Sequence, residues 1–459
     1  MKVNLGIDIG TTHIKAVAVD RAGTTRFRMS ASPRLHSVGE GGFEQDPEEI
    51  EQIVQNMIST CSTQWTVERV AFSAAMHSFM VVTPAGEPLT RSWTWQDQRA
   101  RAQAQQVRRA GLSKKWYELT GCPVHAMSPA VKWLAWAEER NSAAGMPVAL
   151  KDWLYFRLTG IWCTDFATAS ASGLAGLDGR WRADMLRELR IDPARLPSIH
   201  DLATTHSRYV LGATDGAMSH YALQVWGQSR EAVLSWGTSA AIRTNRLAVQ
   251  DLRFSRTGSF AYFWGPGYGY LVGQALSNAG NVLQWISRIC QVSPAEAVAQ
   301  GLAMLESGQS LPFFLPFLFG ERSPYWNESL RAGFLKIDAR HQNGHLLAAV
   351  VLGLLGLLKG AYERLQETCG PLAAVRVGSS LAQQRPWGQA IADVLGSALE
   401  QSIPDDASAW GAAMLAAGGS RPPEPLPHAV IEPQGARWVH RVAEYLEELQ
   451  AMAPTGVDG

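Results

Sequence analysis

Apolar residues alternate with other residues at the start of the chain. The pattern covers residues 3–9, breaks at "GTT", and resumes at residues 14–19. Period-two alternation interrupted by a short glycine-containing segment predicts a β-hairpin with a Gly-Thr-Thr tip. The stretch "EAVLSWGTSAAIRTN" at residues 231–245 has the same design, with "GTS" between two apolar strands. This repeated unit predicts two similar halves that face one another.

Both predicted tips carry groups suited to phosphate. A glycine lets backbone N–H groups turn toward an anion, the hydroxyls of Thr11 and Thr12 add donors, and Asp8 stands at the end of the first strand. A carboxylate in that position is suited to a magnesium shell. The alternative is that glycine and threonine only form the turn, as they do in many hairpins.

Other segments predict a mixed α/β chain. Asp46 is expected to cap a helix that begins at Pro47, and "RVAFSAAMHSFMVV" predicts a strand, a short loop and a second strand. Met76 and His77 lie at that break. A helix is expected from "SNAGNVLQWISRI", a long apolar helix around residues 346–366, and a final amphipathic helix ending near Met452.

The segment "RSWTWQDQR" suggests carbohydrate chemistry. If it is extended, Trp93, Trp95, Asp97 and Arg99 share one face, where indole rings cover C–H surfaces and charged groups bind hydroxyls or an acid. The alternative is a half-buried strand with a local ion pair between Asp97 and Arg99. His77 could likewise be a core histidine whose hydrogen bonds are satisfied.

Asp215 lies between Thr214 and Gly216, just before an alanine-rich helical run. A carboxylate near a helix N-terminus is electrostatically favoured to stay ionised, so Asp215 is a candidate base. Helix N-capping alone would also explain an aspartate at this position.

Composition narrows the class of protein. A chain of 459 residues suggests two domains of roughly 200 residues each. The 41 Lys and Arg residues balance 41 Asp and Glu residues, so there is no basic field to bind nucleic acid or an anionic membrane. Five scattered cysteines and an apolar run that stops at Lys359 suggest a soluble cytoplasmic protein without a membrane span.

These motifs together resemble the FGGY family of carbohydrate kinases, from about Val3 to Ala417. The matching segments occur in family order, and include "GIDIGTT", "AMH", "TWQDQR", "GATDGAM", "WGTSAAIR", "NAGNVLQW" and "GERSPYWN". The resemblance implies an α/β, two-lobed actin-like or RNase H-like ATPase fold with a central cleft. We expect an N-terminal lobe at residues 1–228 with the sugar site, and a C-terminal lobe at 229–459 with the nucleotide site.

The resemblance also implies roles for individual residues. Asp215 would be the catalytic base and, with Asp8, would hold Mg²⁺, while Met76, His77, Trp95 and Asp97 would face the sugar. The expected ATP-binding residues are Thr11, Thr12, Lys15, Gly237, Thr238, Gly280, Gln284, Ser379 and Ser380. Glu321 and Arg322 would connect loops near the cleft.

Within the family the chain looks most like gluconokinases, which implies ATP-dependent phosphorylation of D-gluconate to 6-phosphogluconate. Two departures keep alternatives open: His13 replaces a small residue, and Ser379 and Ser380 replace a pair of glycines, which predicts weaker ATP binding or a changed donor. The alternatives are a xylulokinase-like or other ketose or polyol kinase, and a non-catalytic sugar sensor. Oligomeric state is left open, with a homodimer as one option.

Overall fold

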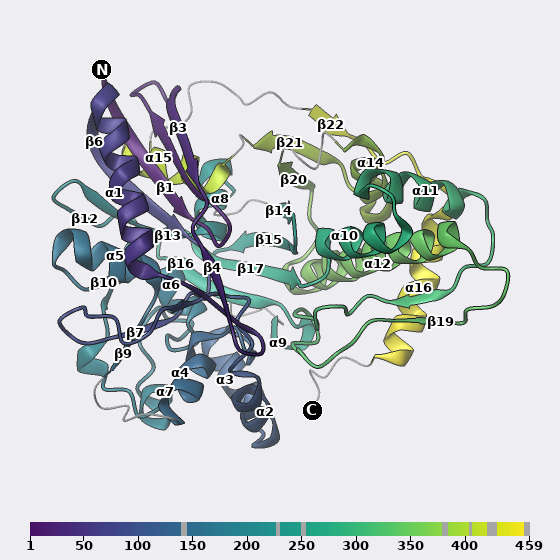
Figure 1. Ribbon diagram of the computed structural model, residues 1–459, viewed down its shortest axis with the longest axis horizontal. Coiled ribbons are helices and arrows are strands. Elements are labelled where there is room, and N and C mark those ends of the chain that lie inside the picture. Colours follow the sequence, from purple (N-terminus) through teal and green to yellow (C-terminus); the bar gives the residue numbers. More distant parts are fainter. Residues whose placement is uncertain are drawn as a thin grey trace.

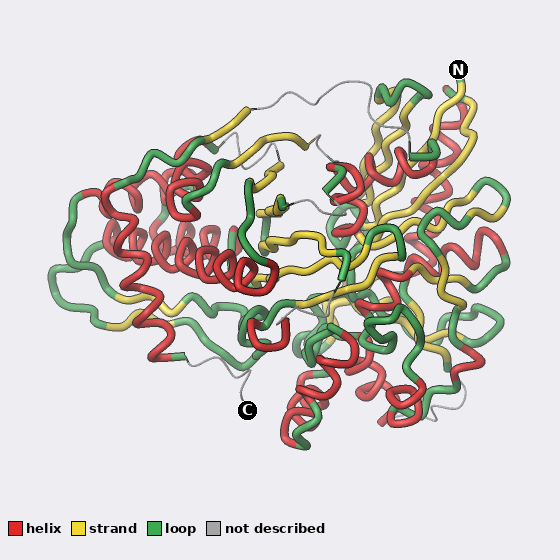
Figure 2. Tube along the Cα trace, turned by 180° about the vertical axis from the view of Figure 1, so that it is seen from behind, coloured by secondary structure: helices red, strands yellow, loops and turns green. Residues whose placement is uncertain are grey.

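The computed structural model describes residues 1–138, 145–225, 230–248, 254–378, 384–403, 406–419 and 429–453. It shows two lobes, each built around a mixed β-sheet (Figure 1). In the second lobe the strands lie toward the middle of the molecule and most helices lie at its far side, whereas helices lie on both sides of the first sheet (Figure 1 and Figure 2).

The first sheet has the order β12-β13-β6-β1-β2-β3. β1, β2 and β3 form an antiparallel meander, and β6 and β13 are parallel to β1. The β1–β2 hairpin is the one predicted from the opening alternation, with Asp8 opposite Lys15. The bounds of these strands are β1 (Lys2–Ile9), β2 (Ile14–Val19), β3 (Thr25–Ala31), β6 (Thr66–Ala74), β12 (Thr205–His206) and β13 (Tyr209–Thr214).

The second sheet repeats the topology of the first. Its order is β16-β17-β15-β14-β20-β21-β22, and β20 and β21 run parallel to β14 while β15 and β17 are antiparallel neighbours. The series β17-β15-β14-β20-β21 therefore matches β3-β2-β1-β6-β13, which confirms the two similar halves. The bounds are β14 (Glu231–Trp236), β15 (Ala240–Arg246), β16 (Phe260–Gly265), β17 (Gly269–Leu276), β20 (Ala374–Gly378), β21 (Leu399–Ile403) and β22 (Ala429–Ile431).

Helices and short strands complete the first lobe. Asp46 caps the first helix as expected, since its carboxylate accepts hydrogen bonds from the N–H groups of Glu48 and Glu49. The helices are α1 (Pro47–Gln64), α2 (Arg101–Arg109), α3 (Ser113–Thr120), α4 (Pro129–Glu138), α5 (Leu150–Thr159), α6 (Phe166–Ala171), α7 (Ala183–Glu188), α8 (Asp215–Leu223) and the 3₁₀ turn η2 (Pro193–Arg195). The short strands are β4 (Leu35–Val38), β5 (Gly42–Gln45), β7 (Met80–Val82), β8 (Ser92–Trp93), β9 (Met146–Val148), β10 (Cys163–Asp165) and β11 (Ser198–His200).

The core of the second lobe is organised around one long apolar helix, α12 (Asn343–Cys369). It is long and apolar enough to cross a membrane by length and composition, but most of it is buried against its neighbours in the lobe. The neighbouring elements are α9 (Phe254–Thr257), α10 (Gly280–Cys290), α11 (Pro294–Glu306), α14 (Arg385–Leu395), η3 (Arg437–Val439), α16 (His440–Met452), β18 (Phe313–Leu315) and β19 (Gly333–Leu335). The predicted helices near residues 346–366 and ending near Met452 are confirmed.

One helix from the second half of the sequence packs on the first sheet. α15 (Ala407–Ala416) lies beside β1 and α8 in the first lobe (Figure 1). The approach is close because two glycines lack side chains. A Cβ on Gly6 would come within 2.0 Å of the Ala409 carbonyl oxygen, and a Cβ on Gly411 within 2.2 Å of the Met218 oxygen.

The predicted boundary between residues 228 and 229 lies outside the described residues and stays a prediction. All five cysteines are free thiols, four of them buried. A cytoplasmic location also stays a prediction.

The contact at Gly411 can be tested by adding one methyl group. Gly411→Ala should lower the free energy of unfolding by about 1–3 kcal/mol, because the new Cβ must push α15 away from α8. Gly333→Ala is the control, since a Cβ there has no atom within 4 Å. Thermal unfolding followed by circular dichroism measures both, and equal midpoints for the two variants would contradict this packing.

Candidate active site

Three parallel strands of the first sheet end at the same edge, and their ends carry the acidic residues predicted from the sequence. Asp8 lies near the end of β1 and pairs in register with Ser73 of β6, while Asp215 directly follows β13. Because β6 lies between β1 and β13, the parallel order brings both carboxylates to one place.

Asp8 is held in an environment that disfavours its charge. Burial and the neighbouring Asp215 carboxylate raise the pKa of Asp8 to about 7, against the opposing effects of the Ser73 hydrogen bond and Lys15. The Ser73 hydroxyl donates to Asp8 Oδ1 at 2.7 Å. The Asp215 carboxylate is therefore close enough to Asp8 to disfavour its ionised form. Mg²⁺ commonly uses one or two carboxylates together with phosphate oxygens, so this pair fits that ion.

Asp215 does not cap its own helix. The N-cap of α8 is Thr214, whose hydroxyl accepts a hydrogen bond from Ala217 N–H at 3.4 Å. The Asp215 carboxylate instead takes a hydrogen bond from Gly216 N–H to Oδ1 at 2.7 Å. Burial raises the pKa of Asp215, while the nearby Arg243 guanidinium lowers it. The N-capping alternative therefore does not account for this aspartate.

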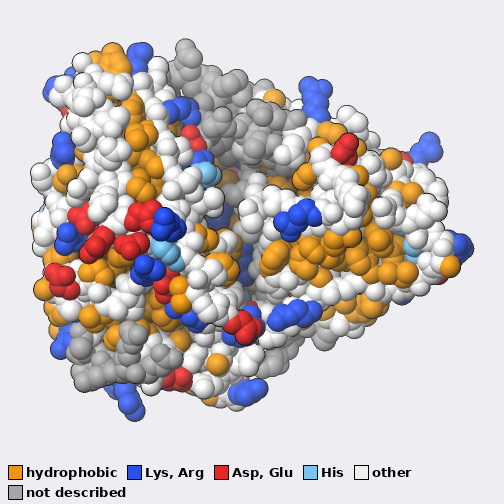
Figure 3. Space-filling model, viewed as in Figure 1, with side chains coloured by type: hydrophobic (Ala, Val, Ile, Leu, Met, Phe, Trp, Pro, Cys, Tyr) orange, Lys and Arg blue, Asp and Glu red, His pale blue; other side chains and the backbone are white. Residues whose placement is uncertain are grey.

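Asp215 lines a cavity of about 360 Å³ between the two lobes. Figure 3 shows the molecule hollowed at this place, with Lys or Arg side chains in the depth of the hollow. The lining residues from the first lobe include Met76, His77, Trp95 and Ser219, and those from the second include Ser235, Gly237, Ser239, Arg243, Tyr262 and Arg322.

The absence of a side chain at Gly216 makes room next to Asp215. A Cβ there would lie 2.4 Å from the terminal methyl of Met76 and 3.3 Å from Arg243 Nε. Groups from both lobes therefore meet at the first turn of α8.

His77 lies at the break between β6 and β7, as predicted, with a φ of 63° in the left-handed region. Its Nδ1–H donates to the Ala171 carbonyl at 2.9 Å, and its Nε2 lies 3.4 Å from the Tyr262 hydroxyl. Burial and the Lys132 charge lower the pKa of His77 to about 3, so the ring is neutral at pH 7. The side chain has hydrogen-bond partners, as the core-histidine alternative supposes, and it also lines the cavity.

A buried lysine connects two loops that line this cavity, those of His77 and Trp95. Lys132 of α4 is completely buried, and its ammonium donates to the carbonyl oxygens of His77 and Thr94, each at 2.8 Å. Burial lowers its pKa to about 7. One ammonium thus holds the His77 loop to the Trp95 loop. Sequence reasoning missed this residue, because nothing in its apolar helix marks the lysine as a connector.

The prediction for the Trp95 segment is partly wrong. The strand β8 ends at Trp93, and a turn follows in which Asp97 N–H donates to the Thr94 carbonyl. Trp95 lines the cavity, but Asp97 is completely buried away from it. Its carboxylate accepts hydrogen bonds from Phe43 N–H at 2.9 Å and from Arg99 Nη2 at 2.6 Å. The local ion pair with Arg99 is therefore present, and a sugar contact by Asp97 stays a prediction.

The tips of the two hairpins are fixed by neighbours. Gln45 donates to the carbonyl oxygens of Gly10 and Thr11, both at 3.2 Å. In the second lobe Gly280 N–H at the start of α10 donates to the Gly237 carbonyl at 3.0 Å. A Cβ on Gly280 would come within 2.5 Å of that oxygen, so only glycine allows this contact.

The remaining predicted nucleotide residues have varied surroundings. Gly237 and Thr238 are exposed at their tip, Thr11 and Thr12 lie at the other tip, and Gln284 is exposed on α10. Lys15 forms an ion pair of 2.7 Å with Asp406, which precedes α15. Ser379 and Ser380 lie outside the described residues.

Within the described ranges, no group of three or more His, Cys, Asp or Glu side chains forms a candidate metal site.

Glu321 connects loops, as expected. Its carboxylate is completely buried and accepts hydrogen bonds from Ser277 N–H at 2.5 Å and Asn278 Nδ2 at 2.9 Å. Arg322 also lines the cavity, and its guanidinium carbon lies 5.2 Å from the centre of the Trp95 ring.

Arg243 also lines the cavity. Its guanidinium donates a hydrogen bond to the Ser235 hydroxyl at 3.3 Å, and its Nε has no partner among the described residues. Its place in "GTSAAIR", just after the second hairpin tip, was the available signal.

Comparison with known proteins agrees with this geometry. Residues 3–214 match the N-terminal domain of the FGGY family of carbohydrate kinases, and residues 232–419 match its C-terminal domain. Two α/β lobes, each with a hairpin that has a glycine-threonine tip, define an actin-like ATPase fold. This confirms the predicted fold class. The chain belongs to the FGGY family of carbohydrate kinases, and it is accordingly an ATP-dependent phosphotransferase.

Three similar proteins illustrate the relationship. The gluconokinase of Bacillus subtilis (strain 168) is 28% identical over 451 residues, which cover 90% of this chain and 86% of that protein. The structure of ligand-bound xylulose kinase from Lactobacillus acidophilus superposes with a TM-score of 0.89 at 24% identity, over 100% of both chains. Gluconate kinase from Lactobacillus acidophilus gives 0.88 at 23% identity, also over 100% of both.

The role of Lys132 leads to a kinetic prediction. Lys132→Met removes two charge-assisted hydrogen bonds that hold the loops of His77 and Trp95, so the KM for the sugar should rise at least tenfold. The KM for ATP should change less than twofold. Lys114→Met, at an exposed position on α3, is the control and should match the natural protein. An unaltered sugar KM in Lys132→Met would show that the loops keep their positions without the ammonium.

Proposed function

We propose that this protein transfers the γ-phosphoryl group of ATP to the terminal hydroxyl of D-gluconate, forming 6-phosphogluconate. The observation that carries the proposal is that one cavity contains the candidate base Asp215 together with two arginines, Arg243 and Arg322. Neither arginine forms an ion pair with a carboxylate among the described residues. A neutral sugar gives such cations no partner, whereas a sugar acid does. The similarity to a gluconokinase at 28% identity supports the same substrate.

Asp215 would act as the base. The Gly216 N–H donates to Oδ1 and so orients the carboxylate that would accept the proton of the attacking hydroxyl. A buried carboxylate with a raised pKa is a stronger base than an exposed one, and the Arg243 charge keeps it ionised before the reaction. Met76, His77 and Trp95 would hold the sugar, with the neutral His77 ring and the Tyr262 hydroxyl facing its hydroxyl groups.

The two hairpin tips would bind the phosphates. Backbone N–H groups and hydroxyls at Thr11, Thr12, Gly237 and Thr238 would surround them. Asp8 and Asp215 would hold Mg²⁺, which supplies positive charge at the transferring phosphoryl group when bound with the nucleotide.

Arg243 would add a fixed charge beside Asp215. Lys15, Gly280 and Gln284 are proposed for the nucleotide side, where Lys15 would act through its ion pair with Asp406 as well as by its charge. The role of Ser379 and Ser380 in nucleotide preference stays a prediction from the sequence.

The base assignment predicts a loss of turnover without a loss of binding. Asp215→Asn should lower kcat by roughly two to four orders of magnitude, the usual contribution of a positioned general base. Gluconate affinity, measured by calorimetry, should stay within a few-fold of the natural value. Asp338→Asn, a change at a partly exposed carboxylate outside the cavity, is the control. A variant Asp215→Asn with natural turnover would remove Asp215 from the mechanism.

The substrate assignment is tested by comparing acceptors. D-gluconate should have a higher kcat/KM than D-xylulose or glycerol when ADP release is followed with each. The expected reason is the attraction between the substrate carboxylate and the unpaired arginines, which the two neutral acceptors lack. If a ketose reacts and gluconate does not, the protein is a kinase of a different sugar. If no sugar or sugar acid reacts although sugars bind, the sensor alternative is favoured.

A further inference from the structure

A second cavity, of about 470 Å³, lies next to the one that contains Asp215. Trp95 and Arg322 line both cavities, so this stacked pair lies between them. The second cavity also joins the two lobes, because Gln98 and Arg101 come from the first lobe and Glu328 and Arg331 from the second. We refer to it below as the outer cavity.

Several polar groups of the outer cavity have no hydrogen-bond partner among the described residues. They are two donors, Arg101 Nε and Arg322 Nε, and two acceptors, Gln98 Oε1 and Glu328 Oε2. A buried polar atom without a partner typically costs about 1–3 kcal/mol, and native proteins contain few of them. Four such atoms lie around a single cavity, where a ligand or bound water can supply the missing partners.

The charge of the outer cavity is positive. Arg101, Arg322 and Arg331 line it, and none of them pairs with a carboxylate in the part of the chain that the structure describes. The Arg331 guanidinium donates to the backbone oxygens of Glu328 and Leu330, at 3.0 and 2.8 Å.

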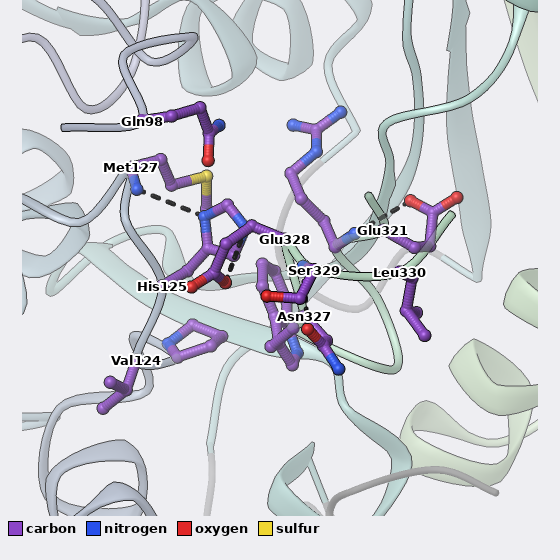
Figure 4. A network of polar contacts seen from close by, with 12 residues as sticks. Gln98, Val124, His125, Met127, Glu321, Asn327, Glu328, Ser329 and Leu330 are labelled. Atoms are coloured by element: carbon purple, nitrogen blue, oxygen red, sulfur yellow. Dashed lines mark hydrogen bonds and ion pairs between the residues drawn. The ribbon is translucent and has the colours of Figure 1, made fainter. Parts of the chain in front are cut away.

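The one acidic residue of the outer cavity is already compensated. Glu328 is buried, and its Oε1 accepts from Arg108 Nη2 at 2.7 Å. His125 adds no charge, because burial and the nearby arginines lower its pKa to about 3. Figure 4 shows its ring close to Glu328, with Nδ1 accepting from Met127 N–H at 3.2 Å and Nε2 at 3.8 Å from Glu328 Oε2.

We propose that the outer cavity binds the carboxylate end of the sugar acid whose terminal hydroxyl lies at Asp215. This inference rests on the proposed function and names the residues that would select an acid. The unpartnered groups have the matching chemistry: two guanidinium groups donate to a carboxylate, and two acceptors take hydrogen bonds from sugar hydroxyls. The Trp95 ring between the cavities would cover the C–H surface of an extended chain.

A nucleotide phosphate is the competing occupant, because Thr238 of the second hairpin tip also lines the outer cavity. A substitution of Arg101 can distinguish a substrate carboxylate from a nucleotide phosphate in the outer cavity. It lies at the start of α2 in the first lobe, and its guanidinium has no hydrogen bond or ion pair with any described residue. Removing its charge therefore breaks no contact that holds the fold together.

The experiment compares Arg101→Gln with Arg109→Gln, an exposed arginine on the same helix. KM and kcat are measured for D-gluconate and for ATP. D-glucitol, which has a hydroxymethyl group in place of the carboxylate, is tested as a competitive inhibitor. Arg101→Gln should raise the gluconate KM by about 10- to 100-fold, as expected for a lost charge-assisted hydrogen bond, and leave kcat and the ATP KM within twofold. Inhibition by D-glucitol should be equally weak in all three proteins.

Each other outcome contradicts a specific statement. If the gluconate KM of Arg101→Gln is unchanged, or if its ATP KM rises as much as its gluconate KM, the outer cavity does not bind the substrate carboxylate. If the inhibition constant of D-glucitol rises in Arg101→Gln by the same factor as the gluconate KM, Arg101 contributes to the shape of the site and not through its charge. A natural protein that phosphorylates only neutral sugars contradicts the proposed function itself, whatever Arg101→Gln does. Thermal unfolding of each variant verifies that the fold is retained.

Discussion

The close packing of α15 against β1 and α8 is the contact on which the site depends. It joins a helix near the end of the chain to the first strand, at a separation that only Gly6 and Gly411 permit. The same contact brings Ser408 to Asp215, where the Ser408 hydroxyl donates to the Asp215 carbonyl at 3.2 Å. The neighbouring Asp406 reaches Lys15 of the first hairpin. The backbone around the candidate base is therefore held by both halves of the chain.

Charge is distributed differently in the scaffold and in the cavities. In the scaffold, carboxylates are paired: Asp97 with Arg99, and Asp152 and Asp165 with the buried Lys151 at 2.8 and 3.0 Å. In the two cavities the described arginines Arg101, Arg243, Arg322 and Arg331 have no carboxylate partner. A guanidinium that lines a cavity without an ion-pair partner has donors available for an anionic ligand. Nucleotide phosphates and a sugar acid both supply such anions.

Local patterns predicted much of the fold. The alternation before and after each glycine-threonine tip correctly predicted the hairpins β1–β2 and β14–β15, because period-two burial is a property of neighbouring residues. Asp46 and Pro47 correctly marked the start of α1. The same reasoning failed for "RSWTWQDQR", where alternation continued but the chain turns after Trp93. Hydrogen bonds from Phe43 and Arg99 hold the Asp97 carboxylate at that turn, and both partners' positions depend on the folded chain.

The sequence by itself determined the two repeated halves, the family resemblance and the candidate base. Each of these depends on short motifs whose chemistry is local. Only the tertiary structure decided which charged groups face the cavities. Arg101, Arg243 and Arg322 are separated by up to 221 residues and belong to different segments, so no spacing connects them. Their common feature is a place beside a cavity without a carboxylate within ion-pair distance among the described residues, and such a place arises only when distant segments pack together.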